Sequence, residues 1–161
     1  MKTMCIRVLA CVLAVLALTI CFAACDGGSD SALYFSAGGE KIAIGDTDEV
    51  IGKLGTPLSE TSSESCGGFD GKDYVYTDKG YRVSTTPAKN GQIICKVELT
   101  DDSVKTPEGV YIGMSRAEAE TAMKAYTAES VGDNLVYAVA GVKLQVLFRD
   151  GFVSGLIYVA E

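Results

Sequence analysis

The mature part of the sequence predicts an α+β fold of two tandem repeats. Each repeat is a short helical segment followed by a three- to four-stranded antiparallel meander, with the helices on one face of the sheet. An Ile-Gly tetrad, a Val-Tyr pair with a later glycine, and an Xaa-Gly turn each occur twice: at 44–47 and 112–115, 75–80 and 136–141, and 90–91 and 150–151. The three features occur in the same order in both copies, while the sequence distance between corresponding features changes slightly along the chain. They therefore indicate a duplicated unit.

Residues 1–24 are predicted to be a secretory signal peptide. Their only charges are Lys2 and Arg7, and an apolar stretch runs from Val8 to Ala24, which is typical of such signals. The alternative is an uncleaved transmembrane helix, since about 17 apolar residues lie at the short end of the spanning range.

Cys25 is the predicted lipidation site. The residues Phe22-Ala23-Ala24-Cys25 resemble the lipobox of bacterial lipoproteins, in which an apolar residue and two small residues precede the acylated cysteine. Cys21 is a weaker alternative because the bulky Ile20 precedes it. Residues 25–40 are then the lipidated cysteine and a tether whose first residues are Gly, Ser and Asp. We expect a protein anchored by lipid at the extracytoplasmic face of the cell membrane.

The mature chain is strongly acidic. All 21 acidic residues lie beyond the signal but only 12 of the 14 basic ones do, so the mature net charge is −9. Such a chain repels phosphate backbones, and nucleic acid is not expected as a partner. The remaining Lys and Arg residues form no run, so no polybasic membrane-binding patch is expected.

Cys66 and Cys95 are predicted to form a disulfide. They remain once three cysteines leave with the signal peptide and Cys25 is lipidated, and an even pair in an exported chain is most often bridged. Closing that loop contributes roughly 3 to 4 kcal/mol on the chain-entropy estimate. A zinc or redox thiol pair is the alternative, but the chain has no histidine and no Cys-x-x-Cys.

Each repeat, 41–103 and 104–161, opens on a short helical pattern. In the first, Thr47 is the predicted N-cap. In the second, Ser115 and Glu118 have the spacing of a capping box. The buried stripe of the second helix is predicted to contain Ala119, Ala122, Met123 and Tyr126.

Three runs with a period of two follow each helix. The run 142–149 alternates apolar and polar side chains, as half-buried antiparallel strands do, and the run 93–99 does the same. Asn90-Gly91 and Asp150-Gly151 predict the turns before the last strands. Because two units of about 55 to 60 residues are marginal alone, we expect one monomeric body with a shared core.

The helix-opening segments carry a resemblance to a known family. Ile-Gly-Asp-Thr-Asp-Glu-Val-Ile-Gly-Lys-Leu-Gly at 44–55 and Ile-Gly-Met-Ser-Arg-Ala-Glu-Ala at 112–119 resemble segments of the β-lactamase inhibitory protein family and of the small lipoproteins of the BamE (SmpA/OmlA) family. The second segment is not followed by the glycine that ends the first. The resemblance implies a fold whose usual work is binding another protein. No functional side chain of the inhibitor is matched here, so β-lactamase inhibition is not carried over.

No residue pattern predicts a catalytic or metal site. A chain without histidine cannot form a Ser-His-Asp or Cys-His arrangement. The pairs Gly38-Gly39 and Gly67-Gly68 match no phosphate loop or dinucleotide fingerprint. We therefore expect no enzyme, no cofactor and no metal. An enzyme with a spatially assembled carboxylate site is the less favoured alternative, because such pairs meet only in space.

The predicted partner-binding surface is the sheet face opposite the core. The pattern places Val153, Ile157 and Val159 inward. Six side chains are then predicted to point outward: Lys143, Leu147, Arg149, Phe152, Leu156 and Tyr158. Apolar and aromatic side chains flanked by cations are typical of protein interfaces. The alternative is that this face packs against the first repeat or a loop.

The sequence thus predicts a membrane-anchored extracytoplasmic lipoprotein that acts as a non-enzymatic protein-binding module. Its partner is expected to be an envelope or secreted protein. The alternative function is inhibition of a secreted hydrolase, which the unlipidated domain would display as nanomolar inhibition.

Overall fold

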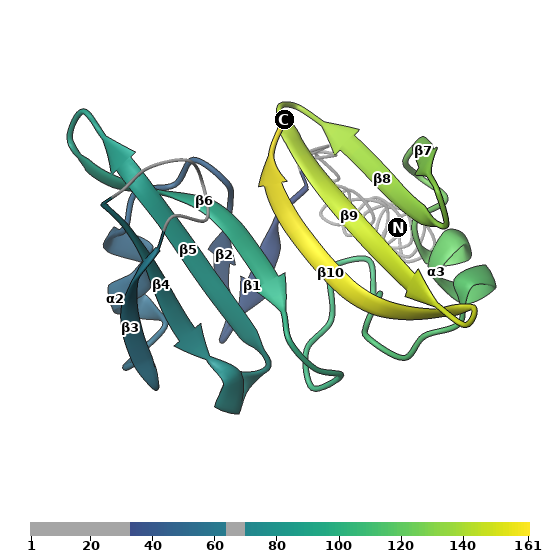
Figure 1. Cartoon of the computed structure of the whole chain (residues 1–161), viewed down its shortest axis with the longest axis horizontal. Helices are drawn as coiled ribbons and strands as arrows, with labels where there is room; N and C mark the ends of the chain where they lie inside the picture. The colour runs from purple at the N-terminus through teal and green to yellow at the C-terminus, as the bar shows by residue number, and fades with distance from the viewer. Residues whose placement is uncertain (1–32, 64–69) are drawn as a thin grey trace, which may run out of the picture. The chain divides into compact units, whose positions relative to one another are not determined.

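A computed structural model describes residues 33–63 and 70–161 (Figure 1). The expected signal peptide, Cys25 and Cys66 lie outside these residues. Of the described residues 51% are in strands and only 12% are helical. The predicted α+β class is therefore wrong, and the fold is mainly β.

The helices are too short to form a layer of the fold. Helix α2 (Glu49–Lys53) has five residues, helix α3 (Arg116–Ala122) has seven, and the 3₁₀ turn η1 (Thr77–Lys79) has three. None of the helices in the described parts of the chain is long and apolar enough to cross a membrane.

Eight strands form one antiparallel sheet in the order β3-β4-β5-β6-β10-β9-β8-β7 (Figure 1). The strands are β3 (Ser59–Ser63), β4 (Gly71–Tyr76), β5 (Tyr81–Ala88), β6 (Gly91–Leu99), β7 (Ala128–Val131), β8 (Asn134–Val139), β9 (Val142–Arg149) and β10 (Phe152–Ala160). Each half of the sheet is a four-stranded meander. The halves join through their last strands, β6 and β10, so the sheet is continuous.

The two halves share a backbone hydrogen-bond pattern. The N–H of Gly45 donates to the carbonyl of Ile94 at 2.8 Å, and the N–H of Gly113 donates to the carbonyl of Val153, also at 2.8 Å. In both halves the segment ahead of the helix is thus bound to the beginning of the last strand. This contact places each helix beside one face of its meander.

The two helices begin differently. The side chain of Ser115 accepts a hydrogen bond from the backbone N–H of Glu118, and the Glu118 side chain accepts one from the backbone of Ser115, so the predicted capping box is confirmed. Helix α2 instead follows Asp48, whose side chain makes no cap hydrogen bond. The predicted N-cap at Thr47 is therefore wrong by one residue. Two residues of the predicted stripe of α3 are buried: Ala119 within the helix and Met123 just beyond it.

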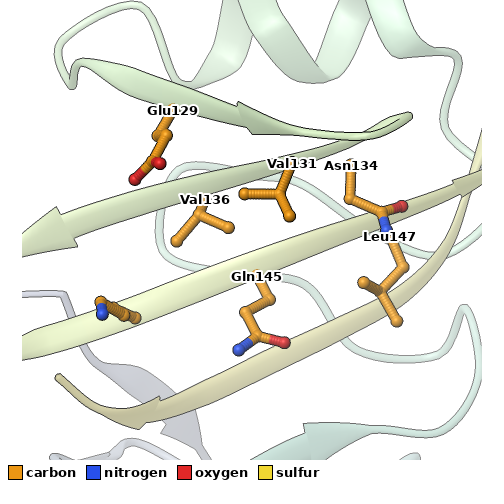
Figure 2. A pocket seen from close by; sticks show the side chains of 7 residues that line it. Glu129, Val131, Asn134, Val136, Gln145 and Leu147 are labelled. Atoms are coloured by element: carbon orange, nitrogen blue, oxygen red, sulfur yellow. The ribbon is translucent and has the colours of Figure 1, made fainter.

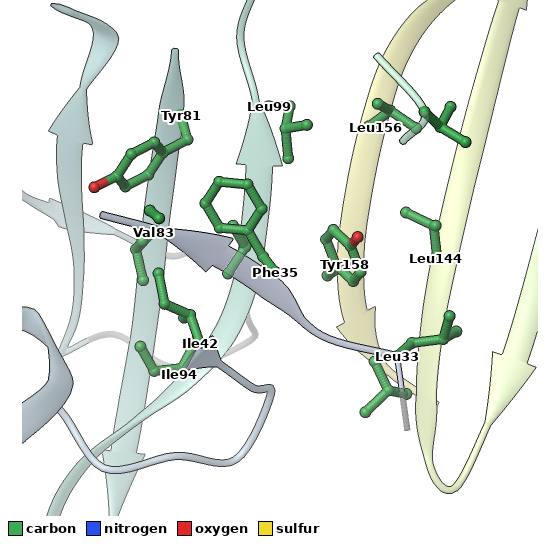
Figure 3. Packing of buried hydrophobic residues seen from close by; sticks show 14 of the residues in the cluster. Leu33, Phe35, Ile42, Tyr81, Val83, Ile94, Leu99, Leu144, Leu156 and Tyr158 are labelled. Atoms are coloured by element: carbon green, nitrogen blue, oxygen red, sulfur yellow. The ribbon is translucent and has the colours of Figure 1, made fainter. Parts of the chain in front are cut away.

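A separate hairpin ties the two halves together on the core side. Strands β1 (Phe35–Ala37) and β2 (Glu40–Ile42) form their own two-stranded sheet. The ring of Phe35 lies 5.2 Å from that of Tyr81 in the first half and 6.4 Å from that of Tyr158 in the second. Figure 3 shows Phe35 between the two groups of strands, where apolar burial stabilises one joint core.

The predicted disulfide stays a prediction, because Cys66 lies outside the described residues. Cys95 is buried in β6, and its Sγ lies 3.4 Å from the carbonyl oxygen of Ser84.

Candidate functional site

A bulge in β10 decides which side chains face outward. Val153 pairs with Phe148 and Gly155 pairs with Leu147, so Ser154 is an extra residue on β10. An extra residue shifts the alternation of every side chain that follows it. The prediction that Leu156 and Tyr158 point outward is therefore wrong.

Both displaced side chains belong to the core. Leu156 and Tyr158 are buried, with exposed fractions of 0% and 1%. Burial raises the pKa of Tyr158 well above its ordinary value, so its hydroxyl stays protonated at physiological pH. Neither side chain is available to a partner.

The register places the other four predicted residues on the face opposite the core. Lys143, Leu147 and Arg149 alternate with the core residues of β9, and Phe152 pairs with Arg149. Phe152 is 53% exposed. We refer to the face opposite the core on strands β7 to β10 as the outer face.

The outer face also contains apolar residues that were not among the predicted partner-binding residues. Ile157 pairs with Gln145, Val159 pairs with Lys143, and Val136 of β8 also pairs with Gln145. All are half-buried. The alternation of β8 was a signal that could have found Val136. The prediction that Ile157 and Val159 point inward is wrong, because the bulge turns both side chains to the outer face.

The outer face is hollowed beside the edge strand β7. A depression of about 280 Å³ is lined by seven residues of β7, β8 and β9: Glu129, Val131, Asn134, Val136, Lys143, Gln145 and Leu147. Figure 2 shows Val136 and Val131 on neighbouring strands, with Gln145 and Leu147 on the next strand. Of these lining side chains, three are apolar and four are polar, so the depression offers both apolar and hydrogen-bonding contacts.

The cations of the outer face lack acidic partners. Among the described residues, no carboxylate lies within ion-pair distance of Lys143 or Arg149. The same face of the first half differs, because there Arg82 lies 3.6 Å and Lys96 lies 4.0 Å from Glu98. Within the described residues, the cations of β9 thus differ from Arg82 and Lys96 in having no carboxylate at ion-pair distance.

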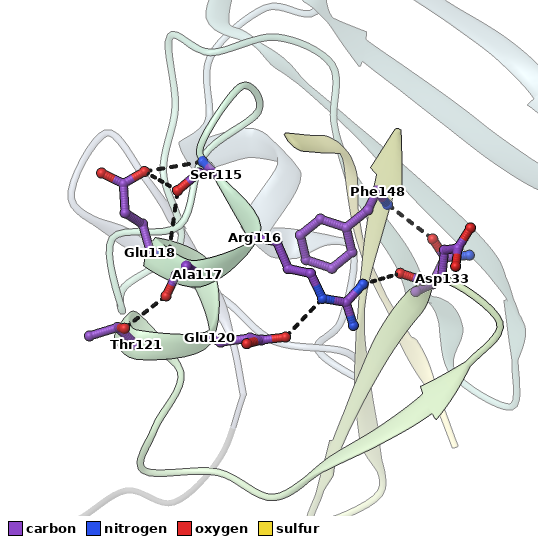
Figure 4. A network of polar contacts seen from close by, with 9 residues as sticks. Ser115, Arg116, Ala117, Glu118, Glu120, Thr121, Asp133 and Phe148 are labelled. Atoms are coloured by element: carbon purple, nitrogen blue, oxygen red, sulfur yellow. Dashed lines mark hydrogen bonds and ion pairs between the residues drawn. The ribbon is translucent and has the colours of Figure 1, made fainter. Parts of the chain in front are cut away.

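A polar network holds α3 against the rim of the outer face (Figure 4). Arg116 Nε lies 2.9 Å from Glu120 Oε1. The Nη1 atom of Arg116 donates a hydrogen bond to the carbonyl of Asp133 at 2.8 Å. The guanidinium also lies over the ring of Phe148 at 4.8 Å. Arg116 is thus occupied by structural contacts, and the position of β9 and its neighbouring loop is supported from the side of the helix.

The described residues contain no group of three or more Cys, Asp or Glu side chains that could hold a metal ion. The outer face carries half-buried apolar side chains, the exposed ring of Phe152, two cations without a carboxylate at ion-pair distance, and polar side chains that include Glu129. Comparisons of the chain with protein-family models, with curated proteins and with solved structures each gave no match. The resemblance to the β-lactamase inhibitory protein and BamE (SmpA/OmlA) families accordingly stays a prediction.

Proposed function

We propose that this protein is a non-enzymatic binding module, anchored by lipid at the extracytoplasmic face of a membrane, whose outer face binds another protein. The observation that carries the proposal is that the exposed Phe152 lies opposite Arg149 in the strand register, at the end of a surface that also carries half-buried apolar side chains. Aromatic and Arg side chains together are enriched at interfaces.

The partner is expected to present apolar side chains flanked by carboxylates. Lys143 and Arg149 have no ion-pair partner among the described residues, whereas the cations of the neighbouring half are paired. Carboxylates on the partner would complement them. The overall negative charge of the chain does not oppose this contact strongly, because exposed charges farther than about 10 Å apart are screened at physiological salt.

The proposal is tested with two matched aspartate variants of the chain from Asp26 to Glu161, which includes every described element and the whole core. Phe152 and Leu58 are both exposed apolar side chains, at 53% and 62%. Phe152→Asp changes the outer face, while Leu58→Asp makes the same kind of change ahead of β3. A photo-crosslinking amino acid at position 152 or 58 identifies what lies next to each position in native envelopes.

Support requires one defined protein that crosslinks at position 152 and not at 58, with binding lost in Phe152→Asp and kept in Leu58→Asp. Arg149→Glu should also weaken binding. A lysine that replaces the facing carboxylate residue of the partner should restore binding to the Arg149→Glu variant. Equal binding by the two aspartate variants, or no crosslinked partner, would overturn the proposal.

The membrane anchor has its own test. Cys25→Ser should release the chain from the membrane fraction and abolish labelling by a palmitate analogue, because stable anchoring needs the acyl chains. Cys21→Ser is the matched control and should change neither result. A Cys25→Ser protein that stays in the membrane fraction would instead support the uncleaved helix.

A further inference from the structure

A second depression, on the core side of the sheet, is lined by three lysines. It has a volume of about 400 Å³ and receives residues from β1 and its turn, the end of α2, η1, the beginning of β5 and the segment after β6. The lining residues with charged side chains are Lys53, Lys79 and Lys105. Among the residues that the structure describes, none with a carboxylate lines it, although acidic residues outnumber basic ones in this chain.

Two of these lysines are positioned by a carbonyl group and by aromatic rings rather than by carboxylates. Lys79 Nζ donates to the carbonyl of Leu54 at 2.8 Å and lies 5.0 Å from the centre of the Tyr76 ring. Lys105 Nζ lies 4.6 Å from the centre of the Tyr111 ring. An ammonium group has three donors, so Lys79 keeps two of them after its bond to Leu54. Neither lysine has a carboxylate within ion-pair distance among the described residues.

The third lysine is only weakly paired. Lys53 Nζ lies 3.6 Å from Glu40 Oε2, and the two side chains are 62% and 42% exposed. Exposed pairs of this kind contribute little and exchange readily for another anion. Three like charges around one depression repel each other, and a bound anion relieves that repulsion.

The floor of the depression is apolar. Tyr81 and Leu54 are buried, Ala37 lies at the limit of burial, and Val104 packs against the core. A volume of about 400 Å³ lies within the usual range of small-ligand sites. The geometry therefore suits a ligand that combines an anionic group with a small apolar or ring-shaped part.

We propose that this depression binds a phosphate-bearing ligand through Lys53, Lys79 and Lys105. Lysine is a common phosphate ligand that acts as a point charge. The same phosphate chemistry is offered by a soluble phosphate compound and by an anionic lipid headgroup, so the test has one arm for each source. The site is separate from the outer face, because Tyr81 points to the core side, and its failure would leave the proposed function untouched.

The test uses the chain from Asp26 to Glu161 and two double variants of equal charge. Lys53→Gln with Lys105→Gln removes two site lysines and leaves Lys79, which also contacts the end of α2, in place. Lys89→Gln with Lys124→Gln removes two exposed lysines elsewhere. One arm titrates pyrophosphate at constant ionic strength and follows the backbone amides by NMR. The other measures co-sedimentation with phosphatidylcholine vesicles with and without phosphatidylglycerol.

We expect pyrophosphate to shift the amides of Gly38, Leu54 and Lys105, and the site variant to bind roughly tenfold more weakly than the control variant. Binding to phosphatidylglycerol vesicles without pyrophosphate binding, again lost only in the site variant, would support a lipid headgroup as the source of the phosphate. Equal weakening in both variants would show non-specific attraction and overturn the proposal. Absence of binding in both arms would overturn it as well.

Discussion

Leu156 of β10 lies directly opposite Leu99 of β6 at the junction between the two halves, and both side chains are buried, with exposed fractions of 0% and 2%. The joint core therefore continues across the contact between the halves. This pair exists only because the bulge at Ser154 turns Leu156 toward the core.

Leu156→Ala is expected to lower the free energy of unfolding by roughly 2 to 5 kcal/mol, because the truncation leaves a cavity in a packed core. Urea unfolding followed by circular dichroism measures the change. Phe152→Ala is the control and should change stability by no more than about 0.5 kcal/mol, since its side chain is exposed. A larger cost for Phe152→Ala than for Leu156→Ala would contradict the bulge.

Gly80→Ala should be more destabilising than Gly141→Ala. The two glycines hold equivalent turns, with φ values of +79° and +83°, and their carbonyls accept the N–H groups of Thr100 and Glu161. Alanine in this left-handed conformation costs about 1 to 2 kcal/mol at either position.

Only at Gly80 would the new Cβ also collide with its surroundings. It would clash with Ser103 Oγ and lie 2.5 Å from Asp101 Oδ1, whereas nothing lies within 4 Å at Gly141. Asp101 accepts a hydrogen bond from the N–H of Ser103 at 2.8 Å, so relief of the clash disturbs that turn. Thermal unfolding of both variants compares their losses of stability. Equal losses would show that the turn at Gly80 rearranges without a further loss of stability.

Ser115→Ala should destabilise the protein by about 1 kcal/mol, because it removes the side-chain oxygen that caps α3. Thr47→Ala tests the corresponding position before α2 and should have almost no effect, since that helix has no side-chain cap. Chemical unfolding of both variants measures the difference. A Thr47→Ala loss as large as that of Ser115→Ala would mean that Thr47 caps α2 in solution.

The free energy of unfolding should fall at alkaline pH. Burial raises the pKa of Tyr81 to about 12 and also raises the pKa of Tyr76, Tyr137 and Tyr158. The ordinary pKa of tyrosine in an unfolded chain is about 10. Because the folded state favours the protonated hydroxyl, the stability linked to these groups is fully present below about pH 10 and is lost as the pH rises toward 12.

Urea unfolding at pH 8, 10 and 11, with tyrosinate absorbance recorded in parallel, checks this prediction. In Tyr81→Phe the free energy of unfolding should fall less between pH 10 and 11 than in the unsubstituted chain, since one titrating group is removed. Stability that stays constant over this range would contradict the burial of these rings.

Local pattern was enough to predict parts of this molecule. The period of two over 142–149, the Asp150-Gly151 turn and the Ser115 capping box all depend on residues within a few positions of each other. The same patterns placed Lys143, Leu147 and Phe152 of the candidate surface on the outer face, because these residues precede the bulge.

Only the tertiary structure decided the class, the order of the strands and the inward direction of Leu156 and Tyr158. The sequence by itself determined the strand over 142–149, the turn at Asp150-Gly151 and the start of α3, because neighbouring residues encode these through side-chain alternation and capping. It did not determine that β6 pairs with β10 or that Ser154 is an extra residue. The β6–β10 pairing depends on hydrogen bonds and packing between segments far apart in the chain, and one unpaired residue in β10 reverses every side chain that follows it.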